Sequence, residues 1–126
     1  MVNVNVKRQR GDLGERIVAD YLEKEGFTIV TRNYRHRIGE VDLIAERGDL
    51  LAFVEVKARS HSFFDLTEVI SKPKQRRIIA CAKRYIMEHS VYDKSIRFDV
   101  ALIEDLDSQA IMYIPDAFTE QLFGGL

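Results

Sequence analysis

The sequence predicts an α/β fold in which helices flank a central mixed five-stranded sheet. Two segments place apolar residues at helical spacing, and shorter runs between and after them are apolar or alternate as strands do. The predicted order of elements is αβββαββ. Three consecutive strands favour an antiparallel meander, and a helix before the fourth strand favours a crossover to a parallel neighbour.

The first helix is predicted to follow a polar arm of residues 1–10. Asp12 is its expected N-cap and Gly26 its expected stop. A strand is expected at residues 27–30, and residues 31–37 are expected to carry basic side chains into a loop. The buried face of the helix is marked by apolar residues at helical spacing: Leu13, Ile17, Val18, Tyr21 and Leu22.

Residues 40–57 predict a hairpin at the centre of the sheet, because its two runs are the most apolar of the chain. Gly48-Asp49 between them fits a two-residue turn. If Arg47 pairs with Leu50, the register of the whole hairpin follows from the turn.

This register brings four charged residues together on one face of the hairpin. Asp42 is expected directly opposite Glu55, and Glu40 directly opposite Lys57. Two opposed carboxylates repel each other at this separation, so the pair calls for a cation. Mg²⁺ or Mn²⁺ is the expected cofactor, since hard cations take one or two carboxylates and complete their shell with water and phosphate oxygens.

The alternative is a plain ion pair between Glu40 and Lys57, with Asp42 and Glu55 at a solvated end of the sheet. That ion pair accounts for a lysine at position 57, but it does not account for two opposed carboxylates inside an apolar run. In the metal interpretation, Lys57 holds the attacking water or neutralises charge that develops on a phosphate.

Residues 71–89 predict a second helix, which starts at Ser71 or Lys72 with Pro73 in its first turn. The helix dipole favours acids at this end, yet the opening turns hold cations and no acid, so a bound phosphate would stabilise them. The alternative is a solvated basic face. The cations of this helix start are Lys72, Lys74, Arg76 and Arg77.

Three further segments complete the predicted fold. The polar residues 58–70 are expected to form a loop beside the site. Residues 96–102 alternate as a strand, and residues 110–114 form the last strand before a C-terminal tail of residues 115–126. Asp99 interrupts the fourth strand, where we expect a structural pairing with a nearby cation.

The composition bounds the class of protein. At 126 residues and 46% hydrophobic content, residues 1–126 are expected to form one domain with a real core. We expect a cytoplasmic protein that does not enter a membrane, since no apolar run approaches the length of a membrane span and the N-terminus lacks a secretory signal. The single Cys81 has no partner for an internal disulfide and is expected in the core of the second helix.

Charge is distributed unevenly along the chain. Residues 1–84 hold 17 Lys and Arg against 12 Asp and Glu, whereas residues 85–126 hold 2 against 8. The basic part also contains the opposed carboxylates, which suits a polyanionic substrate. Further arginines flank the ends of the hairpin, among them Arg35, Arg37 and Arg59.

Glu15 has two interpretations. It lies on the margin of the apolar stripe of the first helix, where its carboxylate would face the sheet. Asp12-Leu13-Gly14-Glu15 also matches a capping box, and local sequence alone favours this cap. Gly14 points the other way, since a glycine inside a helix often permits a close approach.

The motifs resemble known nucleases. Asp42, a spacer of twelve residues, and Glu55-Val56-Lys57 resemble the core of the restriction-endonuclease-like nuclease superfamily. Over residues 7–104, a wider set of motifs is similar to the YraN family of small bacterial proteins, which resemble archaeal Holliday-junction resolvases. These motifs are Gly11-Asp12-Leu13-Gly14-Glu15, Arg32-Asn33-Tyr34-Arg35, Gly39-Glu40-Val41-Asp42-Leu43-Ile44, Phe53-Val54-Glu55-Val56-Lys57-Ala58-Arg59, Lys74-Gln75-Arg76-Arg77 and Arg97-Phe98-Asp99-Val100.

The resemblance implies a restriction-endonuclease-like core and assigns roles by position. Asp42, Glu55 and Glu15 would hold the metal, and Lys57 would be the catalytic lysine. Gln75, at the opening of the second helix, is a further catalytic candidate.

Together these features predict a Mg²⁺- or Mn²⁺-dependent endonuclease that acts on DNA and selects branched or junction structures. The alternative is a nucleic-acid-binding protein that retains the fold without turnover. RNA or a nucleotide is an alternative substrate, since nothing in the sequence distinguishes ribose from deoxyribose. A resolvase that cuts two strands symmetrically would be a homodimer, although nothing in the sequence establishes one.

Overall fold

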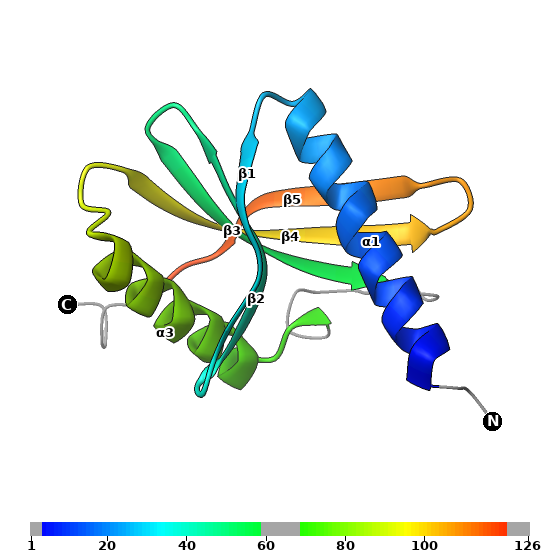
Figure 1. Ribbon diagram of the computed structural model, residues 1–126, viewed down its shortest axis with the longest axis horizontal. Coiled ribbons are helices and arrows are strands. Elements are labelled where there is room, and N and C mark those ends of the chain that lie inside the picture. Colours follow the sequence, from blue (N-terminus) through cyan, green and yellow to red (C-terminus); the bar gives the residue numbers. More distant parts are fainter. Residues whose placement is uncertain (1–3, 59–68, 121–126) are drawn as a thin grey trace.

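The computed structural model describes residues 4–58 and 69–120 (Figure 1). Its elements confirm the predicted α/β class and the order αβββαββ. They are α1 (Val4–Lys24), β1 (Thr28–His36), β2 (Gly39–Arg47), β3 (Leu50–Ala58), α3 (Lys72–His89), β4 (Ser95–Asp105) and β5 (Ala110–Phe118).

The strands form one mixed sheet in the order β1-β2-β3-β4-β5, so the predicted hairpin supplies its central strand. The first three strands are antiparallel neighbours, and α3 carries the chain to β4, which is parallel to β3. β5 then returns antiparallel to β4. The predicted meander and crossover are both confirmed.

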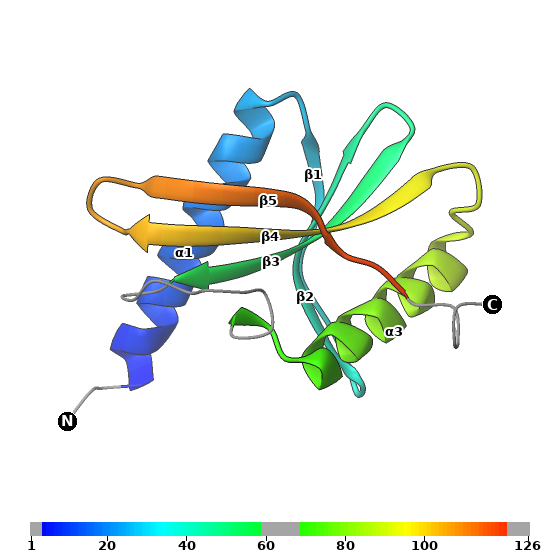
Figure 2. The same cartoon turned by 180° about the vertical axis from the view of Figure 1, so that it is seen from behind.

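One helix covers each face of the sheet. Leu22 of α1 lies in one buried cluster with Leu43, whereas Ile78 of α3 lies in the other with Ile44 and Phe53. Leu43 and Ile44 are adjacent in β2 and face opposite helices, as the period of a strand requires. In Figure 1 α1 crosses in front of the sheet, and in Figure 2 it lies behind β4 and β5. Neither of these two described helices has the length and apolar character that a membrane crossing needs.

The first helix begins earlier than the sequence predicts. α1 starts at Val4, inside the expected polar arm of residues 1–10, because the Lys, Arg and Gln of that arm are good helix formers. Asp12 therefore lies within the helix and does not cap it, so the capping-box interpretation of Glu15 is wrong. The end of the helix is as predicted, since α1 stops before Gly26, whose φ is +92°.

Two strands extend into segments that were predicted as a loop and a tail. Residues 31–37 continue β1 as far as His36, which pairs with Gly39 of β2. The basic side chains there are compatible with a strand because β1 is an edge of the sheet and leaves them in water. β5 likewise runs to Phe118, into the expected tail of residues 115–126.

Two interior residues have the structural roles that were predicted. Cys81 is fully buried in the core beneath α3. Asp99 is fully buried in β4, and both of its carboxylate oxygens accept hydrogen bonds from the Arg97 guanidinium at 2.9 Å. The Tyr113 hydroxyl and the Asp116 amide also donate to Asp99, so its charge and hydrogen-bonding needs are met within the fold.

Candidate active site

The sheet forks between β2 and β3. The two strands pair in the predicted register from their shared turn as far as Leu43 and Val54, and the ladder ends there. The predicted direct pairs of Asp42 with Glu55 and of Glu40 with Lys57 lie beyond that end and are not formed. Beyond the end of the ladder β2 stays beside β1, while β3 continues beside β4 (Figure 1). Asp42 and Glu55 are the first residues past the last pair, one on each branch of the fork.

Asp42 links the two branches. Its Oδ2 atom accepts a hydrogen bond of 2.8 Å from the backbone amide of Val56, so the carboxylate replaces a backbone partner that β3 has lost. The side chain is buried, with 8% exposed. Burial raises the pKa of Asp42, although the Val56 amide and the Lys74 ammonium oppose the rise.

Glu55 is the most unusual side chain of the fork. It is 5% exposed, and its Oε1 lies 3.0 Å from Nζ of Lys74, in the first turns of α3. Its Oε2 is buried and has no hydrogen-bond partner among the described residues. Burial and the charge of Asp42 raise the pKa of Glu55 to about 7, in spite of the nearby ammonium groups of Lys74 and Lys57. An added cation would therefore stabilise this carboxylate.

Glu15 approaches the fork from α1. It is half-buried, and burial and the charge of Asp42 raise its pKa, while a hydrogen bond from the Asn33 side chain lowers it. The helix lies close to the sheet here, since a Cβ on Gly14 would be 2.9 Å from Cδ1 of Ile103. The close approach predicted for Gly14 is confirmed, and it brings Glu15 within electrostatic reach of Asp42.

Asn33 is a site residue that sequence reasoning missed. The β1–β2 register places it opposite Asp42, and its side chain bonds Glu15. Its φ of +53° is a left-handed conformation, which is uncommon for a residue other than glycine and tends to occur at functional sites. Two signals in the sequence pointed to Asn33. It lies in the Arg32-Asn33-Tyr34-Arg35 motif, and Asn adopts this conformation more readily than most residues.

The regular alternation of side chains between the two faces of the sheet is interrupted at this position in β2. Val41 and Ile44 both lie in the cluster beneath α3, although residues three apart in a regular strand face opposite sides. Asn33 and Asp42 lie at this break in the alternation. Asp42 therefore interacts electrostatically with residues from both sides of the sheet, with Glu15 of α1 and with Lys74 of α3.

Lys57 lies at the margin of the fork, whereas the contact of Gln75 is to the chain before α3. The charge of Lys57 helps to lower the pKa of Glu55, which places its ammonium within electrostatic reach of that carboxylate. Gln75 is 5% exposed, and its Nε2 donates a 3.1 Å hydrogen bond to the backbone carbonyl of Ile70. The contact that the structure gives Gln75 thus holds the segment that leads into α3.

The plain ion pair between Glu40 and Lys57 is wrong. Glu40 pairs instead with Arg35, whose Nε lies 3.0 Å from Oε2. The physical reason is the fork, because at this point β2 has left β3, and among the described strands it pairs with β1 alone.

The donor set suits a hard cation that keeps much of its own water. Within residues 4–58 and 69–120, no three His, Cys, Asp or Glu side chains lie close enough together to form a metal site by themselves. Mg²⁺ commonly binds through one or two carboxylates and takes its other ligands from water and phosphate. Asp42 and Glu55 fit that pattern, with Glu15 at longer range.

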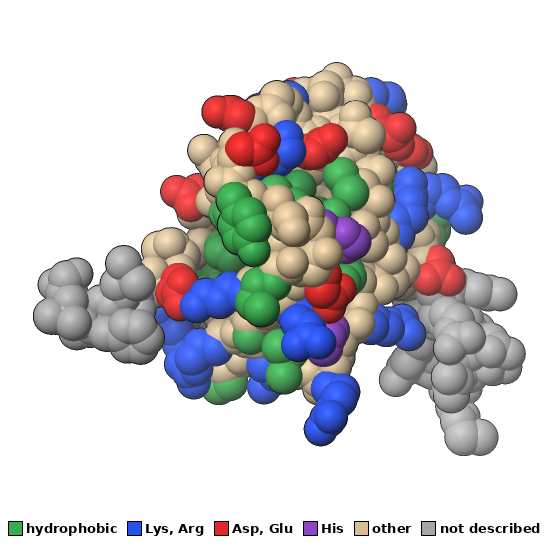
Figure 3. Space-filling view, turned by 60° about the vertical axis from the view of Figure 1, so that its left-hand side comes forward, with side chains coloured by type: hydrophobic (Ala, Val, Ile, Leu, Met, Phe, Trp, Pro, Cys, Tyr) green, Lys and Arg blue, Asp and Glu red, His purple; other side chains and the backbone are tan. Residues whose placement is uncertain are grey.

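The predicted phosphate-binding residues separate into an inward and an outward group. Lys74 turns inward to Glu55, and the N-cap is Ser71, as predicted. Figure 3 shows Lys and Arg side chains gathered over the lower part of the molecule, where α3 lies. Arg59 lies outside the described residues. The exposed group comprises Lys72, Arg76 and Arg77 of α3 with Arg35 and Arg37 of the β1–β2 hairpin.

A search against known protein families gives one family. The model of the uncharacterised protein family UPF0102 matches residues 14–103, which span the fork and the helix beside it. The chain belongs to the UPF0102 family. This is the family that the motifs resemble under the name YraN, so the resemblance is confirmed at the level of the family.

Other UPF0102 proteins are similar over most of their length. The UPF0102 protein of Alkaliphilus metalliredigens is 40% identical over 114 residues, which cover 90% of this chain and 100% of the relative. That of Desulforapulum autotrophicum is 42% identical over 116 residues, 90% of this chain and 96% of the relative. That of Dictyoglomus thermophilum is 44% identical over 97 residues, 76% and 82% of the two chains.

Proposed function

We propose that this UPF0102 protein is a Mg²⁺- or Mn²⁺-dependent nuclease that hydrolyses phosphodiester bonds in DNA, with the fork of the sheet as its active site. The observation that carries the proposal is the state of Glu55. Its Oε2 is buried without a partner among the described residues, and its carboxylate lies beside a second buried carboxylate, that of Asp42. Such a pair destabilises the fold unless a cation or a proton compensates, and strongly perturbed carboxylates cluster at functional sites.

Each residue of the fork has a role in this reaction. Asp42 and Glu55 would hold the metal, and Glu15 would add negative charge behind Asp42. A bound Mg²⁺ or Mn²⁺ would supply Lewis-acid stabilisation of the phosphate and a water of lowered pKa. Lys57 orients the attacking water and stabilises charge on the phosphate, while Lys74 keeps Glu55 in position.

The exposed cations of α3 and of the β1–β2 hairpin support a nucleic acid as substrate. Arginine and lysine side chains on a surface contact phosphates without reading bases, so we expect weak sequence preference and steep dependence on salt. The resemblance of the Asp42, Glu55 and Lys57 motif to restriction-endonuclease-like nucleases, and of the wider motifs to Holliday-junction resolvases, supports DNA with a branched structure.

A nucleic-acid-binding protein without turnover is the second candidate, and Lys74 is the observation that favours it. The Lys74 ammonium already pairs with Glu55. In a protein that does not bind a metal, this ion pair would serve to neutralise the carboxylate, and the fork would be structural.

Cleavage assays separate the two candidates. The substrates are labelled four-way junctions, flaps, splayed arms, single strands and plain duplex, each with Mg²⁺, Mn²⁺ or EDTA. We expect metal-dependent cleavage that Lys57→Ala and Asp42→Asn each reduce by a factor of about 10² or more, the scale seen when a group that stabilises the transition state is removed. Asn at position 42 keeps an oxygen for the Val56 amide, so this variant should still fold.

Lys83→Ala is the matched control, because Lys83 is an exposed lysine that pairs with Glu120. It should cleave as the wild type does. Wild-type protein that binds these substrates, yet leaves all of them intact with either metal, would establish the binding protein instead.

A further inference from the structure

We infer that a hollow between the β1–β2 turn and α3 binds one unpaired nucleotide of the DNA, and so selects branched or flapped DNA over continuous duplex. This inference rests on the proposed nuclease function and deepens it, because it names the feature of the substrate that the protein recognises. The hollow is separate from the carboxylate fork.

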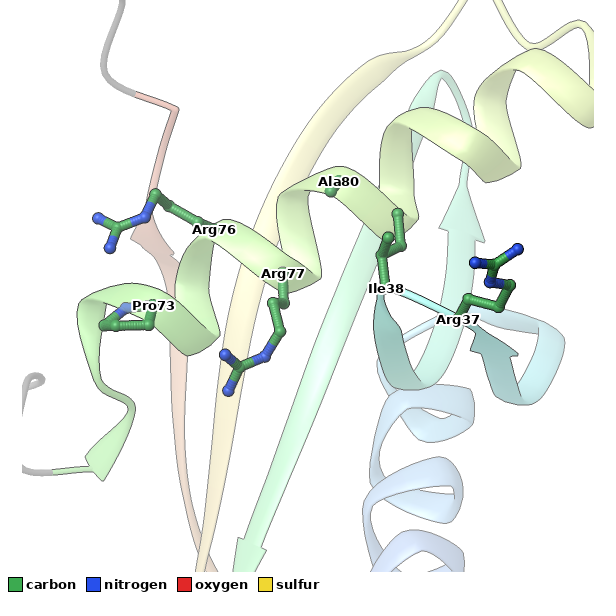
Figure 4. Close-up of a pocket in the computed structure, with 6 residues that line it drawn as sticks. All are labelled: Arg37, Ile38, Pro73, Arg76, Arg77 and Ala80. Atoms are coloured by element: carbon green, nitrogen blue, oxygen red, sulfur yellow. The ribbon is translucent and has the colours of Figure 1, made fainter.

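Two elements form the hollow. Arg37 and Ile38 come from the two-residue turn between β1 and β2, and the rest of the lining comes from α3 (Figure 4). The volume is about 550 Å³, within the range of about 300–1,000 Å³ that is typical of small-ligand pockets. The lining residues from α3 are Pro73, Arg76, Arg77 and Ala80.

The turn is held firmly against the helix. A Cβ on Gly39 would be 3.2 Å from Cβ of Arg77 and 3.5 Å from Sγ of Cys81, so the backbone of the hairpin rests directly on α3. The φ of Gly39 is +153°. This seating presents Ile38 to solvent with 45% of its surface exposed, in a fixed position relative to the arginines of α3.

The chemistry of the lining fits a nucleotide that has left the base stack. Ile38, Pro73 and Ala80 provide apolar surface for a base or a sugar, and Ile38 reaches toward Ala80 in Figure 4. The guanidinium groups of Arg37 and Arg77 supply positive charge for phosphates, and none of the described residues that line the hollow is acidic. In continuous duplex the bases are stacked and paired, so only an unpaired nucleotide can reach this apolar surface.

One turn of α3 contributes a residue to the hollow and a residue that contacts the fork. Lys74, which reaches Glu55 in the fork, lies three residues before Arg77, and residues three apart are neighbours on a helix surface. A strand whose nucleotide occupies the hollow would therefore place its neighbouring phosphates near the carboxylates. Recognition of a branch point would in this way be coupled to cleavage beside it.

Binding measured in EDTA tests the hollow without cleavage. The probes are a labelled duplex, the same duplex with a single-stranded flap, and the flap strand alone, titrated with wild type and Ile38→Ser. We expect the wild type to prefer the flapped DNA over the duplex by about tenfold, which corresponds to about 1.4 kcal/mol, the scale of burying a small patch of apolar surface. Ile38→Ser should abolish this preference and leave duplex affinity unchanged.

Matched controls separate the hollow from general surface effects. Met87→Ser removes an exposed apolar side chain from α3 outside the hollow, and Arg84→Ala removes a cation that pairs with Glu88. Both should bind as the wild type does, whereas Arg77→Ala should weaken all binding and reduce the slope of log affinity against log salt by about one.

Each outcome decides between the two proposals. Equal affinity of the wild type for flapped DNA and duplex, or the same loss in Ile38→Ser and Met87→Ser, would overturn the hollow and leave metal-dependent cleavage intact. A flap preference that depends on Ile38, without cleavage under any condition, would support the hollow and overturn the nuclease.

Discussion

Glu55 lies between apolar neighbours on the central strand of the sheet, and Asp42 lies across the gap where backbone pairing stops. Water is largely excluded from both carboxyl groups, so burial disfavours the charged form of each. The charge of Asp42 raises the pKa of Glu55 further, and the charge of Glu40 raises that of Asp42. The charged groups that act on Glu55 come from two strands and one helix: Asp42 of β2, Lys57 of β3 and Lys74 of α3. At this scale the site is a local excess of negative charge that the fold has not fully compensated.

The raised pKa of Glu55 predicts how stability depends on pH when no divalent metal is present. Its folded pKa is about 7 against an ordinary value of 4.5, so the native state keeps a proton that the unfolded chain has lost. This contribution is complete below the ordinary pKa and is lost as pH rises through about 7. Relative to Glu55→Gln, the free energy of unfolding of the wild type should fall by up to about 3 kcal/mol between pH 4.5 and 8.

Urea unfolding of both proteins at several pH values, in EDTA, measures this difference. A difference that stays constant over the whole range would mean that Glu55 titrates near its ordinary pKa, and that its burial is fully compensated.

The elements approach each other closely where the site requires it. α1 rests on the sheet at Gly14, and the β1–β2 turn rests on α3 at Gly39. Both glycines allow backbone to lie where a side chain would separate the elements. As a result Glu15 and Ile38 are each held at a defined place beside the fork or the hollow.

Two glycines of α1 provide a matched pair for this packing. Gly11 has open space around its Cβ position, whereas a Cβ on Gly14 would lie 2.9 Å from the buried Ile103. Gly11→Ala should therefore stabilise the protein by about 0.5–1 kcal/mol through helix propensity, and Gly14→Ala should show none of this gain. Gly14→Leu should destabilise by about 1–3 kcal/mol because it overpacks the contact.

Thermal or urea unfolding of the three variants measures these effects. Equal stabilisation by Gly11→Ala and Gly14→Ala would show that α1 does not lie as close to the sheet as the structure has it.

At the scale of the whole molecule, the candidate site draws residues from five elements. Glu15 comes from α1, Asn33 from β1, Asp42 from β2, Glu55 from β3 and Lys74 from α3. Three of these five residues are carboxylates, and the charge of Asp42 raises the pKa of both Glu15 and Glu55, although Lys74 pairs with Glu55. A bound cation would therefore favour the folded state as a whole.

We therefore expect Mg²⁺ or Mn²⁺ to stabilise the fold. A ligand that binds only the native state adds about 2.7 kcal/mol at a concentration of 100 times its dissociation constant, which raises the midpoint of thermal unfolding by several degrees. The wild type should show this shift in a melting experiment, and Asp42→Asn should show a much smaller one. Equal shifts in both proteins would place the bound metal away from the fork.

The sequence by itself determined the order of the elements, the central hairpin with its register as far as Leu43 and Val54, and the proximity of Asp42 and Glu55. These features follow from local rules, because side chains alternate along a strand and Gly48-Asp49 closes a two-residue turn. It also determined the family, through the motifs around Asp42 and Lys57. It misplaced the start of α1 and the end of β1, because the charged residues of those segments indicated an arm and a loop, whereas the first segment is helical and the second continues the strand.

Only the tertiary structure decided which residues join the carboxylates. Asn33 enters the site through a left-handed backbone conformation, and Lys74 enters it through its ion pair with Glu55 from the first turns of α3. The position of Ile38 in the hollow depends on the contact between the β1–β2 turn and α3. The physical reason is that these contacts join residues distant in the chain, whose approach depends on packing between elements and on the point where β2 and β3 separate, and no local pattern encodes either.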